Sequence, residues 1–123
     1  MQLAGKVAVI TGGASGIGRG TALAMARRGT DLVIADINDR RLEETRAAIA
    51  TLGRRALAVH CDVAKDADVE RLGETALSAM GHVDILMNNA GVVLRGALEQ
   101  IPMADWEWSF GINLLGEIGR AHV

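Results

Sequence analysis

A glycine-rich segment, TGGASGIG over residues 11–18, constrains the fold of this chain more than any other feature. It follows the apolar run at residues 7–10 and leads into residues 17–28, which have the apolar spacing of a helix. A strand, a glycine turn and a helix in this order can bind the pyrophosphate of a dinucleotide, because the free N–H groups of the helix start face the phosphates. The loop alone also fits an ordinary strand-to-helix turn, so other features must decide between the two.

Three of these glycines have separate expected tasks. Gly12 should permit the tight turn, and Gly16 should let the backbone approach a pyrophosphate without a Cβ in the way. Gly18 should let the helix pack close to the strand.

Further motifs stand at the ends of three other apolar runs. Asp36 closes the run at residues 31–36, close to the offset of about 20 residues at which an acidic side chain meets the ribose hydroxyls of a dinucleotide. Asp62 and Val63 follow the run at 56–61, and the tetrad NNAG at residues 88–91 overlaps the end of the run at 84–88. Ligands of open parallel sheets bind at the carboxyl ends of the strands, where all these motifs are expected to lie.

The alternation of strands and helices predicts an α/β fold with a doubly wound parallel sheet of the Rossmann type. Right-handed crossovers give the strand order 3-2-1-4, with the later strands of that fold missing. We expect one partial dinucleotide-binding domain over residues 1–123, with an apolar fourth strand whose open edge invites aggregation. The expected strands are 7–11, 31–36, 56–61 and 84–88, and the expected helices are 17–28, 39–52 with Asp39 as its cap, 66–80, and one from about residue 104 that carries Trp106, Trp108 and Asn113.

Taken together, the motifs resemble the amino-terminal half of a short-chain dehydrogenase/reductase. The glycine loop of that family, T-G-x-x-x-G-x-G, fits residues 11–18 at every fixed position, and its NNAG tetrad is present unaltered. Its D-V pair after the third strand corresponds to Asp62 and Val63, and its catalytic asparagine on the helix after the fourth strand corresponds to Asn113. The resemblance covers residues 3 to about 116.

The resemblance implies how a nicotinamide cofactor would be held. Asp36 would accept hydrogen bonds from the adenosine ribose and repel a 2′-phosphate, and Ser15 is neutral where relatives that use the phosphorylated cofactor often carry a base, so NAD is expected over NADP. Asp62 and Val63 would frame the adenine, and the last three residues of the tetrad would line the ribose and nicotinamide side, while Asn88 would tie neighbouring strands together. The simpler alternatives are that Asp36 caps a helix and that Asp62 caps the turn before the helix at residue 66. The residues expected to contact the cofactor are Gly12, Ser15, Gly16, Ile17, Gly18, Asp36, Asp62, Val63, Asn89, Ala90 and Gly91.

The resemblance also implies a reaction, hydride transfer between the nicotinamide and a small-molecule alcohol or carbonyl compound, by a parent protein that forms a homo-oligomer. The family's chemistry uses a serine and a Y-x-x-x-K pair, and Asn113 would hold a water that links the lysine to solvent. The 123 residues contain no tyrosine, so we expect them to be inactive by themselves. Two alternatives stay open: a non-catalytic dinucleotide-binding module, and an extended, epimerase-like relative, which the NNAG tetrad disfavours.

Composition narrows the partners and the compartment. A net charge of −2 gives no reason to expect a nucleic acid or an anionic membrane, and no apolar run approaches the length that spans a bilayer. The single cysteine, Cys61, and a start without the apolar core of a secretory signal favour a reducing cytoplasm. Cys61 and His60 are expected in a buried strand, and His82 and His122 have no second ligand at metal spacing, so no metal is expected.

The segment at residues 117–123, EIGRAHV, has several explanations. Its glycine, arginine and histidine spoil the apolar stripe that a helix after Asn113 should carry. The codons ATC GGA AGA GCA CAC GTC encode residues 118–123 and match a common sequencing adapter, which predicts a non-native tail. A natural helix continuation in a partial gene and a genuine short protein are the alternatives.

Overall fold

The computed structural model describes residues 2–91, 100 and 102–110 of the chain. Strands and helices alternate along these residues, as the sequence predicts. Asn113 and the segment at 117–123 lie outside the described residues. The elements are β1 (Val7–Thr11), α1 (Gly16–Arg27), β2 (Asp31–Asp36), α2 (Asp39–Thr51), β3 (Ala56–His60), α3 (Asp66–Met80), β4 (Ile85–Met87) and α4 (Met103–Phe110).

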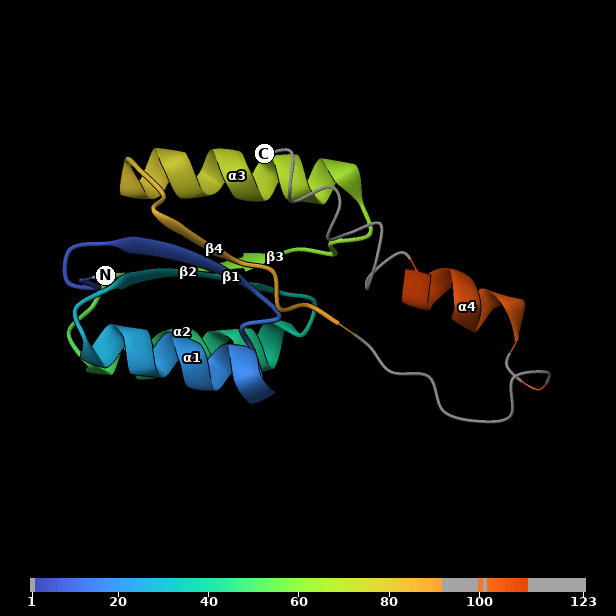
Figure 1. The fold of residues 1–123 in the computed structure, drawn as a ribbon, viewed down its shortest axis with the longest axis horizontal. Helices are drawn as coiled ribbons and strands as arrows, with labels where there is room; N and C mark the ends of the chain where they lie inside the picture. The colour runs from blue at the N-terminus through green and yellow to red at the C-terminus, as the bar shows by residue number, and fades with distance from the viewer. Residues whose placement is uncertain (1, 92–99, 101, 111–123) are drawn as a thin grey trace.

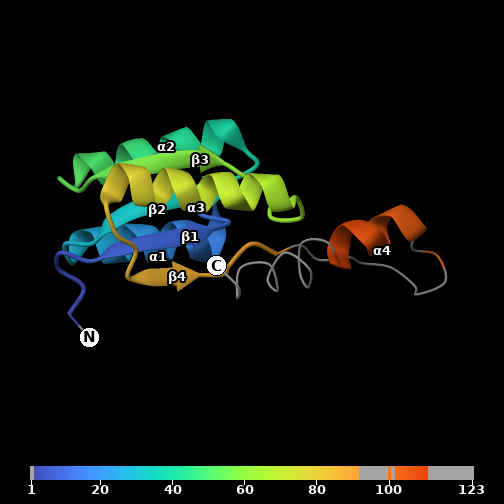
Figure 2. The ribbon, with the colours of Figure 1, turned by 90° about the horizontal axis from the view of Figure 1, so that it is seen from above.

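The four strands form one parallel sheet in the order β3-β2-β1-β4 (Figure 2), which confirms the predicted topology. Val9 in β1 aligns with Val33 in β2 on one side and with Leu86 in β4 on the other. The chain therefore leaves β1 in one direction to build β2 and β3, and returns past β1 to build β4. The point where this order reverses lies between β1 and β4, at the carboxyl end of the glycine-loop strand.

Helices cover both faces of the sheet, with α1 and α2 on one face and α3 on the other (Figure 1). Side chains alternate across a strand, so each strand contributes to two cores. Ala8 and Ile10 of β1 pack in the core on the α1 and α2 side, whereas Val7 and Val9 pack in the core on the α3 side. All four are buried, which explains why the β1 sequence is an unbroken apolar run rather than an alternating one.

The helix boundaries follow local capping chemistry. Helix α2 begins after Asn38, whose side chain accepts the backbone N–H of Arg41 at 3.0 Å, so the prediction that Asp39 caps this helix is wrong. Asp39 instead lies in the first turn, where an acidic side chain suits the helix dipole. Helix α3 ends as predicted at Gly81, which adopts a left-handed conformation at φ +84°.

Strands β3 and β4 are shorter than predicted, since they span Ala56–His60 and Ile85–Met87 rather than residues 56–61 and 84–88. Strand β3 stops at His60, and the His60 side chain is exposed, with Nδ1 2.7 Å from Oδ1 of Asp39. The expectation of a buried His60 is therefore wrong, because the last residue of β3 turns its side chain to the rim of the sheet. Cys61, the next residue, is buried in the α3-side core as expected.

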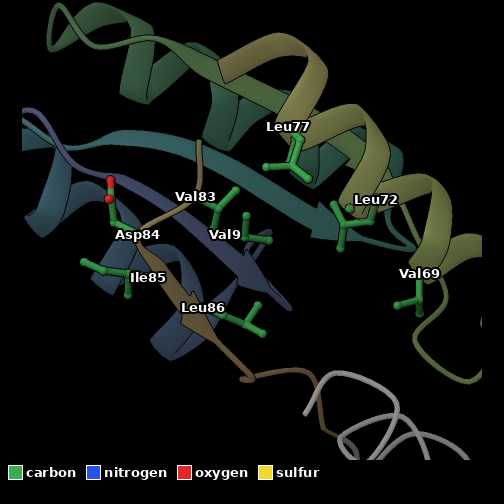
Figure 3. Close-up of a pocket in the computed structure, with 10 residues that line it drawn as sticks. Val9, Val69, Leu72, Leu77, Val83, Asp84, Ile85 and Leu86 are labelled. Atoms are coloured by element: carbon green, nitrogen blue, oxygen red, sulfur yellow. The ribbon is translucent and has the colours of Figure 1, made fainter. Parts of the chain in front are cut away.

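The outer edge of β4 borders an apolar groove. In Figure 3, Leu72 and Leu77 project from α3 towards Val9 of the sheet, and Leu86 comes from β4. The groove measures about 330 Å³, and Leu86 is 42% exposed. Within the described residues β4 pairs with β1 alone, so the expected open apolar edge is present.

Candidate dinucleotide-binding site

A pocket of about 320 Å³ lies at the carboxyl ends of the strands. It brings together residues from all four sheet-to-loop junctions, although these are far apart in the sequence. Eight of the eleven residues expected to contact a cofactor line it. The lining residues are Gly12, Ser15, Asp36, Ile37, Cys61, Asp62, Val63, Asn89, Ala90 and Gly91.

The glycine loop follows β1 into this pocket. Gly12 and Gly16 have φ values of +67° and +57°, a region that favours glycine because it carries no Cβ. Gly12 also lies against the tetrad, since a Cβ on it would approach the Cα of Ala90 to 3.0 Å. A Cβ on Gly16 would meet nothing within 4 Å, so the space beside this glycine is open. This open, Cβ-free backbone is what a close approach by a pyrophosphate requires.

Two further glycines are fixed by packing beneath the loop. A Cβ on Gly18 would overlap the carbonyl oxygen of Gly12, which agrees with the expected close packing of helix on strand. A Cβ on Gly13 would lie 2.9 Å from the side chain of Ile34 in β2. The requirement for glycine at Gly13 was not predicted, since the family pattern leaves that position open.

The start of α1 presents backbone amides to the same region. Ser15 is the N-cap residue, with extended backbone angles, and within the described residues its side chain caps none of the helix amides. The first N–H groups of a helix have no intrahelical partner and carry the positive end of its dipole. The arrangement suits an anion such as a pyrophosphate.

Asp36, at the end of β2, has a carboxylate held by three backbone amides. Its Oδ2 accepts the N–H of Ala14 at 3.1 Å, and its Oδ1 accepts those of Ile37 and Asn38 at 2.7 and 3.3 Å. Because Asn38 is the N-cap of α2, Asp36 is not a helix cap. The carboxylate is therefore oriented by the loop and the turn together, at the rim of the pocket.

Asp62 makes the contact expected of a residue that caps the turn before α3. Its Oδ1 accepts the N–H of Ala64 at 3.0 Å, so it stabilises the turn before α3. Its own N–H donates to Oδ2 of Asp68 at 2.9 Å, and this hydrogen bond lowers the pKa of Asp68 below its ordinary value. Asp62 also lines the pocket, so a turn role and a ligand role are compatible at this position.

The NNAG tetrad is attached to β1 through Thr11. The Thr11 hydroxyl accepts the N–H groups of Asn89 and Ala90 at 3.0 and 3.1 Å. The Asn89 side-chain amide donates to the carbonyl oxygen of Gly12 at 3.2 Å. We expected Asn88 to tie the strands together, and the structure shows this tie at Asn89.

The remaining expected residues lie elsewhere. Gly16 and Ile17 begin α1 and are exposed, with Ile17 75% accessible, and Gly18 is buried below the loop. Arg40 and Arg41 are exposed in the first turn of α2, as expected, and Arg40 pairs with Glu44 at 3.8 Å. Among residues 2–91, 100 and 102–110, no three His, Cys, Asp or Glu side chains are grouped to hold a metal ion.

The structure adds polar residues that the sequence analysis did not assign to the site. Thr45, in α2, donates its hydroxyl to the carbonyl oxygen of Ala14 at 3.3 Å, and Arg19 donates to the same hydroxyl at 2.9 Å. Thr45 is fully buried, and Ala14 is 3% exposed. No local pattern marks a threonine inside a helix as a partner of a loop 31 residues away.

The parallel sheet, the glycine loop at its switch point and the polar strand ends around one pocket define a Rossmann-type α/β protein. Comparison with known sequences supports a narrower class, because a family model described as short chain dehydrogenase matches residues 6–121. The chain belongs to the short chain dehydrogenase family.

Relatives of known sequence and structure agree with this family. A relative named CLA biosynthesis dehydrogenase/reductase, from Lactiplantibacillus plantarum, is 41% identical over 92% of this chain and 40% of its own length. A short chain dehydrogenase/reductase from Burkholderia phymatum, solved in complex with NAD, superposes with a TM-score of 0.94 at 40% identity, over 97% of this chain and 42% of its own. A 3-ketoacyl-(acyl-carrier-protein) reductase from Brucella melitensis, complexed with NADH, gives 0.91 at 38% identity, over 98% and 48%. The chain thus spans less than half the length of these relatives.

No helix among the described residues is long and apolar enough to cross a membrane.

Proposed function

We propose that the pocket binds NAD(H), and that this chain supplies the cofactor-binding part of a dehydrogenase or reductase that acts on a small alcohol or carbonyl compound. The observation that carries the proposal is the Asp36 carboxylate, which three backbone amides hold at the rim of the pocket. A bound nicotinamide cofactor would accept or donate a hydride at its ring. The solved relatives in complex with NAD and NADH support the same assignment.

The residues present fit such a cofactor. Gly16 leaves open space beside the start of α1, where a pyrophosphate would meet backbone amides. Asp36 would accept the ribose hydroxyls, and its negative charge would repel a 2′-phosphate. Asp62 and Val63 would border the adenine, and the tetrad residues Asn89, Ala90 and Gly91 would line the ribose and nicotinamide side.

Preference for NAD over NADP follows from the charges around Asp36. The bases nearest in sequence, Arg40 and Arg41, are exposed on α2, and Arg40 is already paired with Glu44. Ser15 at the loop is neutral and exposed. The carboxylate of Asp36 would therefore repel a 2′-phosphate placed beside it.

Titration of the chain with NADH and NADPH tests the proposal. We expect NADH to bind more tightly, and Asp36→Ala to weaken NADH binding about tenfold or more, because charge-assisted hydrogen bonds contribute about 1.5–3 kcal/mol. The same variant should leave NADPH binding unchanged or improved. Asp39→Ala is the matched control. It removes the same carboxylate charge only three positions after Asp36, but Asp39 does not line the pocket. Tighter binding of NADPH by the unmodified chain, or an unchanged NADH affinity in Asp36→Ala, would overturn the assignment.

Catalysis is a separate proposal. The family resemblance gives Asn113 a role in a proton relay that also needs a tyrosine and a lysine, and the 123 residues contain no tyrosine. We therefore expect these residues alone to bind the cofactor without turning over a substrate. Hydride transfer by the 123-residue chain in a single-turnover assay with NADH and a mixture of aldehydes and ketones would contradict this expectation.

A further inference from the structure

Ala14, in the middle of the glycine loop, is held by hydrogen bonds at both of its backbone polar groups. Its N–H donates to Oδ2 of Asp36 at 3.1 Å, and its carbonyl oxygen accepts the hydroxyl of Thr45 at 3.3 Å. Arg19 then donates from Nη1 to the Thr45 hydroxyl at 2.9 Å. We call this chain of hydrogen bonds, from Arg19 through Thr45 and Ala14 to Asp36, the Ala14 clamp.

The directions of these hydrogen bonds are fixed by chemistry. A guanidinium can only donate, so the Thr45 oxygen must accept from Arg19 and use its single proton towards Ala14. The positive charge of Arg19 polarises the hydroxyl and strengthens the second hydrogen bond. The clamp therefore links α1, α2, the glycine loop and the end of β2, and each of its hydrogen bonds is donated towards Asp36.

Burial makes the central part of the clamp hard to replace with water. Thr45 is fully buried and Ala14 is 3% exposed. Loss of the Thr45 hydroxyl would leave the Ala14 carbonyl without its partner in a place that solvent does not reach. The loop would then have to move or keep an unsatisfied acceptor.

The clamp acts on the oxygen of Asp36 that has acceptor capacity to spare. Oδ1 already accepts two amides, from Ile37 and Asn38, whereas Oδ2 accepts the amide of Ala14 alone among the described hydrogen bonds. A carboxylate oxygen has about two lone-pair sites, so Oδ2 is the oxygen that can take a further donor. Its orientation depends on where Ala14 is held.

We propose that Thr45 is a positioning residue for cofactor discrimination: by fixing Ala14 it fixes Oδ2 of Asp36 for a ribose hydroxyl, and so it favours NAD over NADP. The inference rests on the proposed function, because it assigns a second residue to the same site. Thr45 itself contacts the loop and not the pocket, so its effect passes through Ala14.

The test compares Thr45→Val, which keeps the shape and loses the hydroxyl, with Thr45→Ser, which keeps the hydroxyl. One lost hydrogen bond predicts that Thr45→Val weakens NADH binding about threefold to tenfold. In Thr45→Val, NADPH binding should change less than about twofold, because the Asp36 carboxylate that repels NADPH is no longer held in place. Thr45→Ser should bind both cofactors about as tightly as the unmodified chain does. A merely structural role would weaken NADH and NADPH binding equally in Thr45→Val, and that result would overturn the inference.

A second variant keeps the test open if Thr45→Val does not fold. Arg19→Met retains most of the side-chain stem but removes the donor, so it should lower the NADH-to-NADPH affinity ratio in the same direction and by less. Where Thr45→Val does not fold, an unchanged NADH-to-NADPH affinity ratio in a folded Arg19→Met would overturn the inference.

Amide hydrogen exchange separates this inference from the proposed function. If the unmodified chain binds neither NADH nor NADPH, the proposed function fails, and the clamp is judged by the exchange rate of the Ala14 amide. Exchange at least threefold faster in Thr45→Val than in Thr45→Ser would support a positioning role for the loop. Equal rates in the two variants would overturn it.

Discussion

The hydroxyl of Thr11 accepts the backbone N–H of Asn89 at 3.0 Å and so joins residues that are 78 positions apart in the sequence. Thr11 is the last residue of β1 and is fully buried. The same hydroxyl accepts the N–H of Ala90 at 3.1 Å, and its proton points to the carbonyl oxygen of Met87 at 3.4 Å. One side chain thus holds the start of the glycine loop against the NNAG tetrad, across the point where the strand order reverses.

Thr11→Val should destabilise the chain, because it leaves the amides of Asn89 and Ala90 without their acceptor. We expect the free energy of unfolding to fall by about 1–3 kcal/mol, the cost of unsatisfied buried polar groups. Thr11→Ser keeps the hydroxyl and is the control, with a smaller loss from its missing methyl group. Urea denaturation followed by circular dichroism measures both. Equal losses in the two variants would mean that the methyl group, and not the hydroxyl, holds the strands.

Gly18 and Gly20 lie on the same helix and provide a matched pair. A Cβ on Gly18 would overlap the carbonyl oxygen of Gly12, whereas a Cβ on Gly20 would meet nothing within 4 Å. We expect Gly18→Ala to lower the free energy of unfolding by about 1–3 kcal/mol through overpacking. Gly20→Ala should raise it by about 0.5–1 kcal/mol, because alanine is the better helix former.

The measurement for this pair is the midpoint of urea unfolding in the two single variants. The sign of the change is the informative result, since both variants add the same methyl group to α1. A stabilised Gly18→Ala chain would contradict the close packing of α1 under the glycine loop.

The central strands could be predicted to the residue, and the reasons are local. β1 and β2 are buried on both faces, so their sequences are continuous apolar runs that end abruptly at polar or glycine residues. The strand order followed from the handedness of the crossovers and needed no knowledge of side-chain contacts. Eight of the residues expected to contact a cofactor line one pocket, because strand ends in a parallel sheet share one edge.

Other parts of the site depend on contacts that no local pattern specifies. Asn38 and Asp39 are adjacent and both can cap a helix, so sequence alone did not select Asn38. Thr45 contacts Ala14 only because α1 and α2 pack side by side on the same face of the sheet (Figure 1). The exposed His60 was missed because a strand end can turn towards solvent while the residues on either side stay buried.

Asp31 should make the stability of the chain depend on acid pH. Burial raises the pKa of its carboxyl, but hydrogen bonds and charge from Arg55 and charge from Arg54 lower it by more, so the pKa lies below its ordinary value. Because the unfolded chain then binds protons more readily than the folded chain, this contribution is complete above the unfolded pKa and is lost as the pH falls through the lower folded pKa. The loss should therefore begin near pH 4, the ordinary range of an aspartate, and continue below it.

Asp31→Asn should remove that dependence. At pH 7 we expect it to lower the free energy of unfolding by about 1–3 kcal/mol, since charge-assisted hydrogen bonds from Arg54 and Arg55 are weakened. Glu43→Gln is the control, because Glu43 also pairs with an arginine but lies on the exposed face of α2, where ion pairs contribute little. Urea unfolding of the three chains between pH 3 and pH 7 gives the slope of the free energy of unfolding against pH for each chain. If this slope is the same in Asp31→Asn and in the unmodified chain, Asp31 is not the source of the pH dependence.

The two roles considered for Asp62 can be separated with an altered base. Oδ1 of Asp62 accepts the N–H of Ala64, so Asp62→Asn can keep the turn through its amide oxygen while it replaces the other oxygen with a donor. If that other oxygen accepts the exocyclic amine of adenine, the unmodified chain should bind NADH more tightly than its hypoxanthine analogue, which carries a carbonyl there. Asp62→Asn should then abolish or reverse this preference, a change of about 1 kcal/mol or more, equal to about fivefold in affinity. If Asp62 only stabilises the turn, the preference between the two cofactors will be the same in both chains, and Asp62→Ala will lower the free energy of unfolding without altering that ratio.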